Sequence, residues 1–213
     1  MAERRIGVDE SGKGDFFGPL VIAAVYVGPE HYAELEGVKD SKKLKDETCL
    51  RLSEVIRKTC PHAIVTIGPA KYNELYDKIA NLNTMLAWGH ARAIENVLEQ
   101  VDVDDVISDQ FADPEGLKRH LMEKGRKVNL ESRTKAESDL AVAAASVVAR
   151  AEFIRRLKQL GEKAGVQLPK GANRNVVEAG AEIVRRLGKA ALREVAKLHF
   201  RTLQDVLSTA RRP

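Results

Sequence analysis

The stretch Arg4–Val27 (RRIGVDESGKGDFFGPLVIAAVYV) decides the fold, because it predicts two β-strands joined by a glycine-rich turn. Arg4–Asp9 is typical of a short strand, and Gly18–Val27 (GPLVIAAVYV) is apolar along most of its length, which indicates a longer and largely buried one. Gly12 and Gly14 lie in the turn between them. We expect these strands to begin an antiparallel group at one side of a sheet.

The rest of the chain predicts strands that alternate with helices. Helical spacing of apolar residues, short apolar runs and Gly or Pro breaks set the limits of these elements. We expect helices over Ser41–Thr59, Lys71–Ile79, Thr84–Gln100, from Pro114, over Ser138–Leu160 and after Pro169, and strands over Ala63–Ile67, Val106–Ser108 and Lys127–Leu130. This order favours an α/β fold with a mixed sheet flanked by helices and a helical tail over one edge.

Length and composition indicate a single globular domain. The chain has 213 residues, of which 44% are hydrophobic and 31% charged, and this excludes a mostly disordered protein. We expect a core over about residues 1–165 and a basic helical segment over about 166–213. Two cysteines are too few for a disulfide framework or a structural zinc site. Without a signal peptide or a long apolar run, we expect a cytoplasmic monomer without membrane contact.

Charge is distributed unevenly along the chain. Residues 1–149 carry 20 Lys/Arg and 25 Asp/Glu, a balance of −5, whereas residues 150–213 carry 15 and 6, a balance of +9. An acidic body with a basic last third suits a protein that holds a polyanion near a group of carboxylates. Two differently solvated surfaces would give the same charges.

Acidic residues occur where predicted strands end. Asp9 and Glu10 close the first strand just before the glycine turn, and Asp109 closes the Val106–Ser108 strand. Two adjacent acids at the end of an apolar strand are costly to bury unless a cation neutralises them, although solvated turn residues would also fit. Glu137 stands before the buried helix, where the helix dipole favours an acid, and Asp139 is an equally good candidate there.

Together these acids form the arrangement that two hard cations need. Mg²⁺ takes oxygen ligands and keeps several waters, so a few carboxylates and a substrate phosphate complete its shell. Two such ions stabilise the attacking and leaving oxygens of a phosphoryl displacement. Gly7–Lys13 has the spacing of a nucleotide-binding P-loop, but Gly14 replaces its Ser or Thr, and two acids would repel the phosphates.

Several basic or glycine residues are candidates for contacts with a polyanionic substrate. Gly12-Lys13-Gly14 lets backbone amides and an ammonium group approach closely, and Ser41-Lys42-Lys43 precedes a helix. A capped helix with solvated lysines would also explain the second group. Lys170 and Lys197 belong to the basic tail, and His199 is more typical of a structural histidine. With 5% aromatic residues, stacking of bases on an aromatic platform is not indicated.

The motifs resemble those of the type 2 ribonucleases H over essentially the whole chain. Four blocks match in order: Asp9–Leu20 (DESGKGDFFGPL), Asp40–Leu44 (DSKKL), Asp109–Phe111 (DQF) and Lys135–Ser138 (KAES) with Ala141–Ser146 (AVAAAS). Within that family the chain is more similar to ribonuclease HIII than to HII. The HIII-like features are Asp15–Gly18, Asn81–Trp88, Asp109–Phe111, Glu137 in place of an aspartate, Leu168–Ala172 and Ala196–Phe200.

The resemblance implies an RNase H-like fold, with a five-stranded mixed sheet flanked by helices and a C-terminal helical segment. It implies endonucleolytic cleavage of the RNA strand of RNA/DNA hybrids, leaving 5′-phosphate and 3′-hydroxyl ends, in DNA replication and repair. The metal-binding and catalytic carboxylates carried over are Asp9, Glu10, Asp109 and Glu137, which would hold two Mg²⁺ or Mn²⁺ ions with Asp9 between them. The implied substrate contacts are Gly12, Lys13, Gly14, Ser41, Lys42, Lys43 and Lys170.

The chain departs from the HIII pattern at its start. HIII enzymes usually carry an N-terminal substrate-binding domain similar to the TATA-binding protein, and here eight residues precede Asp9. We therefore expect substrate affinity to depend on the core and the basic tail. The tyrosine with which HII enzymes sense an RNA–DNA junction has no clear counterpart, because Phe200 is the only aromatic residue after Phe153. We expect a preference for stretches of RNA; HII-like cleavage at single ribonucleotides and a catalytically silent hybrid-binding protein are the alternatives.

Overall fold

The computed structural model describes residues 4–39, 41–109, 114–134 and 136–211, and among these the side chains of Pro114 and Glu137 lie outside the description. The strands are β1 (Arg5–Ser11), β2 (Leu20–Val27), β3 (His62–Ile67), β4 (Asp105–Asp109) and β5 (Asn129–Arg133). The α-helices are α1 (Asp46–Thr59), α2 (Pro69–Ile79), α3 (Leu82–Leu98), α4 (Pro114–His120), α5 (Leu140–Ala164), α6 (Arg174–Leu187), α7 (Leu192–Val195) and α8 (Thr202–Ala210). Single 3-10 turns are η1 (Pro29–His31), η2 (Ser41–Lys43), η3 (Gly125–Lys127), η4 (Ala136–Ser138) and η5 (Lys189–Ala191).

The strands form one mixed sheet in the order β3-β2-β1-β4-β5. β1 pairs antiparallel with β2 over its whole length and parallel with β4, and β4 pairs parallel with β5. This confirms the expected α/β fold with a five-stranded mixed sheet. β2 is buried along its entire length, as its apolar sequence predicts.

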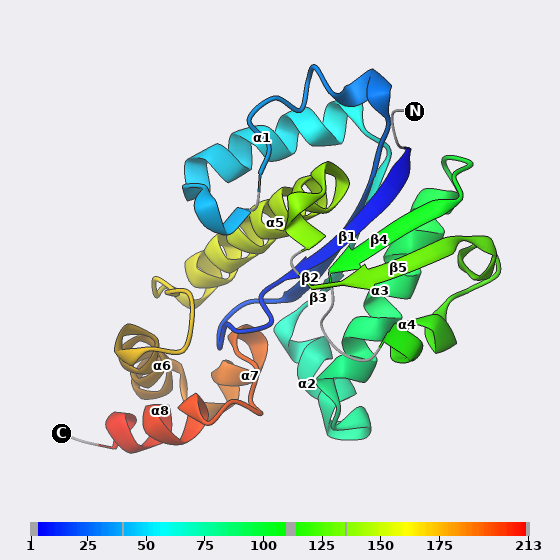
Figure 1. Cartoon of the computed structure of the whole chain (residues 1–213). Coiled ribbons are helices and arrows are strands. Elements are labelled where there is room, and N and C mark those ends of the chain that lie inside the picture. Colours follow the sequence, from blue (N-terminus) through cyan, green and yellow to red (C-terminus); the bar gives the residue numbers. More distant parts are fainter. Residues whose placement is uncertain (1–3, 40, 110–113, 135, 212–213) are drawn as a thin grey trace. The chain divides into compact units, whose positions relative to one another are not determined.

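Helices cover both faces of the sheet. In Figure 1, α3 and α4 lie on one side of the sheet, and α1 and the first half of α5 lie on the other. The α5 face is close-packed at Gly7, where a Cβ atom would lie 2.1 Å from the backbone carbon of Ala141. Glycine at position 7 therefore lets the helix approach β1 two residues before Asp9.

Some boundaries differ from those that the sequence predicts. The helix expected from Ser41 begins at Asp46, because residues 41–43 form the separate turn η2 and Lys45 is extended. The strand expected over Lys127–Leu130 runs instead over Asn129–Arg133, since its parallel pairing with β4 sets its limits. β5 carries mostly polar side chains, so hydrophobic pattern alone does not locate it.

The chain divides into two compact units. The first comprises Met1–Ser11, Val21–Val65 and Asn81–Ala151, and the second comprises Gly12–Leu20, Thr66–Ala80 and Glu152–Pro213. The first unit contains most of the sheet with α1, α3 and α4. The second contains the turn between β1 and β2, α2 and the C-terminal helices, of which α6 packs on α8. The division into a core and a C-terminal segment near residue 165 stays a prediction.

Candidate active site

Three predicted carboxylates lie at the ends of two neighbouring strands. β1 and β4 run parallel with Val8 opposite Ser108, so that the next residues, Asp9 and Asp109, reach the same edge of the sheet. Glu10 follows Asp9 on β1. Asp9 is buried, with 8% of its surface exposed, whereas Glu10 and Asp109 are half-buried. The strand-end carboxylates, as we call Asp9, Glu10 and Asp109, are therefore gathered by the register of the sheet.

Asp9 is held in an environment that opposes its ionisation. Burial, followed by the negative charges of Glu10 and Asp109, raises the pKa of Asp9 from 3.8 to about 8. The backbone N–H of Glu10 donates to Asp9 Oδ1 at 2.8 Å, and Ser146 on α5 donates to the same carboxyl group, but these two bonds do not offset the burial. A carboxylate with this balance gains from a bound cation.

Glu10 points to the opposite face of the sheet from Asp9, because successive side chains of a strand alternate. It meets His90 of α3, whose Nε2 lies 3.1 Å from Glu10 Oε2. The other ring nitrogen, Nδ1, lies 3.0 Å from the hydroxyl of Ser108, the residue before Asp109. His90 is fully buried and connects the ends of β1 and β4.

Asp109 and the turn η4 are joined directly. The backbone N–H of Ala136 donates to Asp109 Oδ1 at 3.2 Å, which places the backbone of Glu137 beside the strand-end carboxylates. The predicted ligand side chain of Glu137 lies outside the described part of the structure. The alternative acid, Asp139, has structural partners: it pairs with Arg5 at 3.0 Å and accepts the backbone N–H of Ala141 at the start of α5.

The donor chemistry at this edge of the sheet fits a hard divalent cation. Carboxylate oxygens are the preferred ligands of Mg²⁺ and Mn²⁺, and the pKa of Asp9 is raised first by burial and then by the charges of Glu10 and Asp109. Within the described side chains, no three His, Cys, Asp or Glu residues are grouped closely enough to hold a metal ion. Glu137 lies outside that search, and the turn that carries it is bonded to Asp109.

The predicted contact residues Ser41, Lys42 and Lys43 belong to the same unit as Asp9. Ser41 is buried, and its hydroxyl lies 2.7 Å from that of Ser146, which in turn donates to Asp9. Arg150 of α5 donates to the carbonyl of Ser41. These bonds fix η2, with its two exposed lysines, on the α5 face near Asp9.

The remaining predicted contacts gather in the second unit. Gly12 has a φ of +89°, a conformation that favours glycine, and begins the loop that carries Lys13 and Gly14. Asp15 accepts the backbone N–H of Gly171 at 2.6 Å, and Gly171 accepts the N–H of Phe16 at 2.9 Å. Lys170 therefore lies next to a segment that is hydrogen-bonded to this loop.

Lys197 differs from its expected place in the basic tail, because its side chain is fully buried. Its Nζ donates to the carbonyls of Asp15 at 2.7 Å, Gly18 at 2.8 Å and Phe17 at 3.4 Å. It also lies 5.7 Å from the centre of the Tyr72 ring. Lys197 thus holds the loop from inside the second unit. Burial lowers its pKa to about 7.

His199 is exposed and stacks on Tyr76, with ring centres 4.2 Å apart, which agrees with a structural role.

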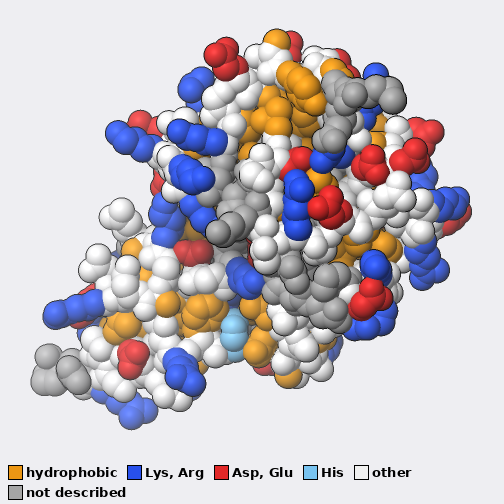
Figure 2. Space-filling model, viewed as in Figure 1, with side chains coloured by type: hydrophobic (Ala, Val, Ile, Leu, Met, Phe, Trp, Pro, Cys, Tyr) orange, Lys and Arg blue, Asp and Glu red, His pale blue; other side chains and the backbone are white. Residues whose placement is uncertain are grey.

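The surface of the second unit carries several exposed cations, of which Arg174 pairs with Glu178 at 3.8 Å and Arg186 with Glu182 at 2.9 Å. In the lower left of Figure 2, where Figure 1 draws α6 and α8, individual Lys and Arg side chains stand among hydrophobic, acidic and other atoms. The exposed cations of these helices and their flanks are Arg174, Arg185, Arg186, Lys189, Arg201 and Arg211. A duplex with phosphates on its surface is the kind of partner that such a surface attracts.

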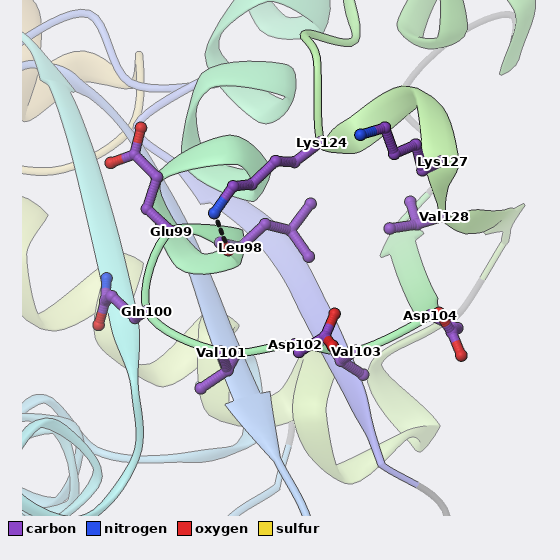
Figure 3. Close-up of a pocket in the computed structure, with 10 residues that line it drawn as sticks. All are labelled: Leu98, Glu99, Gln100, Val101, Asp102, Val103, Asp104, Lys124, Lys127 and Val128. Atoms are coloured by element: carbon purple, nitrogen blue, oxygen red, sulfur yellow. Dashed lines mark hydrogen bonds between the residues drawn. The ribbon is translucent and has the colours of Figure 1, made fainter.

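A separate cavity lies at the opposite end of β4. It has a volume of about 440 Å³ and is lined by Leu98–Asp104 with Lys124, Lys127 and Val128, as Figure 3 shows. Lys124 Nζ donates to the carbonyl of Leu98 at 2.9 Å across it. About 13 Å of strand separates this loop from Asp109, so the cavity contains none of the predicted site residues.

No helix among the described residues is long and apolar enough to span a membrane.

Sequence reasoning missed His90, Ser108 and Ser146, the side chains that hold the carboxylates. His90 is 80 positions from Glu10 in the chain and has no second histidine at metal-binding spacing. Its one local signal is its place in an otherwise apolar stretch of a buried helix, which is also typical of a structural histidine.

Comparison with known proteins supports the resemblance noted in the sequence. The sequence profile of the family described as Ribonuclease HII matches residues 6–203. The ribonuclease HIII of Protochlamydia amoebophila is 49% identical over 95% of this chain and 68% of that protein, and that of Chlamydia pneumoniae is 46% identical over 96% and 70%. The crystal structure of Bst-RNase HIII in complex with Mn²⁺ matches with a TM-score of 0.91 and 37% identity, over 99% of this chain and 71% of that one.

Proposed function

The chain belongs to the ribonuclease HII family, the type 2 ribonucleases H, and on this premise we propose that it hydrolyses the RNA strand of RNA/DNA hybrids with two divalent cations, Mg²⁺ or Mn²⁺. The residues that would hold them are Asp9, Glu10, Asp109 and Glu137. The observation that carries the proposal is the buried Asp9, whose pKa is raised to about 8 by burial and by two neighbouring carboxylates. The Mn²⁺ complex of Bst-RNase HIII supports the choice of cation.

When bound, the two cations supply an activated water and stabilise the leaving 3′-oxygen, so that the products carry 5′-phosphate and 3′-hydroxyl ends. Asp9, next to the other two strand-end carboxylates, would be the central residue that holds the cations. Glu10 and Asp109 would complete the set, and the Ala136 N–H that donates to Asp109 Oδ1 orients that carboxylate.

The basic residues would position the hybrid. In the first unit, Lys42 and Lys43 follow Ser41, which is linked through Ser146 to Asp9. In the second unit, the backbone of Gly12–Gly14 and Lys170 are available for phosphate and 2′-hydroxyl contacts, which identify RNA in a hybrid. We further propose that the enzyme prefers stretches of RNA and works in the cytoplasm; the buried cysteines Cys49 and Cys60, which form no disulfide, suit a reducing compartment.

The test is a gel assay on an end-labelled RNA strand annealed to DNA, with Mg²⁺, Mn²⁺ or EDTA. We expect cutting within the RNA that depends on metal, and little cutting of a duplex with one embedded ribonucleotide. Equal or preferred cutting at the single ribonucleotide would support HII-like activity instead. Binding of the hybrid without cleavage under any metal would support the silent hybrid-binding protein and contradict the mechanism.

A further inference from the structure

We propose that His90 is a positioning residue for the metal site: its hydrogen bond fixes the carboxylate of Glu10 in the orientation that binds a divalent cation. This inference rests on the proposed function, because it concerns the same site. It adds a residue from α3 that belongs neither to the carboxylate set nor to the basic contacts.

The hydrogen bonds of the imidazole define its role. A carboxylate only accepts hydrogen bonds, so His90 Nε2, at 3.1 Å from Glu10 Oε2, must carry the proton of that bond. The Ser108 hydroxyl lies 3.0 Å from Nδ1 and 3.1 Å from the carbonyl of Asp109. Both ring nitrogens therefore have a polar partner: Nδ1 contacts Ser108, and the Nε2–H points at one carboxylate oxygen of Glu10.

Packing prevents the ring from moving away. His90 has no exposed surface, and its neighbour Gly89 brings α3 so close to the sheet that a Cβ atom there would lie 2.7 Å from Cδ1 of Ile22. Ile22 pairs with Glu10 across β1 and β2, so this close contact of helix and sheet occurs beside the carboxylate that His90 holds. Close packing of α3 on the sheet therefore leaves the imidazole of His90 little room to move away from Glu10.

This arrangement predicts a measurable effect on metal binding. Residues that orient a ligand through a hydrogen bond commonly change metal affinity or activity by about 10-fold to 100-fold when they are removed. Without His90, Glu10 can rotate about its side-chain bonds, and the cation must then order it on binding. The loss should therefore show in metal affinity even when no substrate is present.

The test compares His90→Leu, which removes both hydrogen bonds, with His90→Gln, which keeps an N–H donor at a similar distance from the backbone. Ile94→Ala, a buried residue one turn further along α3, is the control for general loosening of the helix. The readouts are the Mn²⁺ concentration that gives half of the Mn²⁺-induced rise in Tm without substrate, and the Mn²⁺ concentration for half-maximal cleavage of the hybrid.

We expect His90→Leu to raise both concentrations at least 10-fold, His90→Gln to restore most of the loss, and Ile94→Ala to lower Tm without changing either concentration. Unchanged Mn²⁺ concentrations in His90→Leu would overturn the inference while wild-type cleavage still supports the proposed function. Equal shifts in His90→Leu and Ile94→Ala would also overturn it, because they would show only loosening of the helix. Failure of the wild-type chain to cleave with any metal contradicts the proposed function itself.

Discussion

Asp9 and Lys197 are both buried ionisable residues, and burial pushes both towards the neutral form, but their surroundings differ. Asp9 faces two like charges, and its pKa is raised to about 8. Lys197, whose pKa is lowered to about 7, donates to three backbone carbonyls of one loop. A buried carboxyl group among like charges favours a cationic partner, and we propose that this partner is a divalent cation. A buried lysine that donates to several backbone carbonyls, as Lys197 does, indicates a structural role.

The largest effect that follows from this difference is the loss of cleavage in Asp9→Asn. Removing the carboxylate between the proposed cations should lower the rate on the RNA/DNA hybrid by about 10³-fold, which corresponds to several kcal/mol of transition-state stabilisation. The fold should persist, because asparagine has nearly the same shape and replaces a carboxyl group that is costly to ionise at this buried position. Cleavage rates and circular dichroism melts measure both.

Asp102→Asn is the matched control for Asp9→Asn. Asp102 is exposed in the loop before β4, at the opposite end of that strand from Asp109, and lines the cavity of Figure 3. The Asp102→Asn variant should cleave the hybrid at the wild-type rate. A near wild-type rate in Asp9→Asn would show that the strand-end carboxylates are not the metal site.

Lys197→Met should have the opposite outcome, a loss of stability rather than of chemistry. Methionine fills a similar volume but leaves the carbonyls of Asp15 and Gly18 buried without a donor, and each such group costs about 1–3 kcal/mol. We expect the free energy of unfolding in urea to fall by about 2–3 kcal/mol. Lys163→Met, at an exposed position of α5, is the control and should change it little. An unchanged free energy of unfolding in Lys197→Met would contradict the structural role of Lys197.

Sequence patterns predict the strand-end carboxylates but not the residues that hold them, and the reason is physical. Asp9 and Asp109 follow apolar strands, so local pattern places them, and the parallel pairing of β1 and β4 brings them together. Contacts such as His90 with Glu10 and Lys197 with Asp15 join positions 80 and 182 residues apart, and they exist only after helices pack. No local periodicity encodes them.

The same limit applies to the fold. The strands β1 and β2 were predictable because their apolar runs flank a glycine turn, and their antiparallel pairing follows from that turn. β5 begins two residues later and ends three residues later than the predicted strand, because its polar side chains give no hydrophobic pattern and only its pairing with β4 sets its limits. Lys197 was assigned to the basic tail since charge alone cannot distinguish a solvated lysine from a buried one.

The pH dependence of stability should have opposite signs for the two buried residues. The folded pKa of Asp9, about 8, lies above its ordinary 3.8, so wild-type protein in EDTA should lose stability relative to Asp9→Asn as pH rises from about 4 to 8. The folded pKa of Lys197, about 7, lies below its ordinary 10.5, so wild-type protein should gain stability relative to Lys197→Met from about pH 7 to 10.

Urea unfolding of the three proteins across pH 4–10 measures both differences, and neither can exceed about 1.4 kcal/mol per pH unit. Slopes of the same sign would show that one of the two residues is not in the environment described above.

The smallest effect on substrate binding is expected from a substitution of Gly14, in the loop whose carbonyls accept hydrogen bonds from Lys197. A Cβ atom there would meet no heavy atom within 4 Å, and Gly14 is not among the glycines with positive φ, so Gly14→Ala should leave Tm unchanged. If the backbone of this loop approaches a phosphate of the hybrid, the added methyl group should raise KM by about threefold to tenfold, or up to about 1.4 kcal/mol, with kcat retained. Gly68→Ala, also in open space but outside the predicted contacts, should leave KM as it is. Equal KM values for Gly14→Ala and Gly68→Ala would indicate that this loop has only a structural role. The substrate contacts would then be assigned to Lys42 and Lys43.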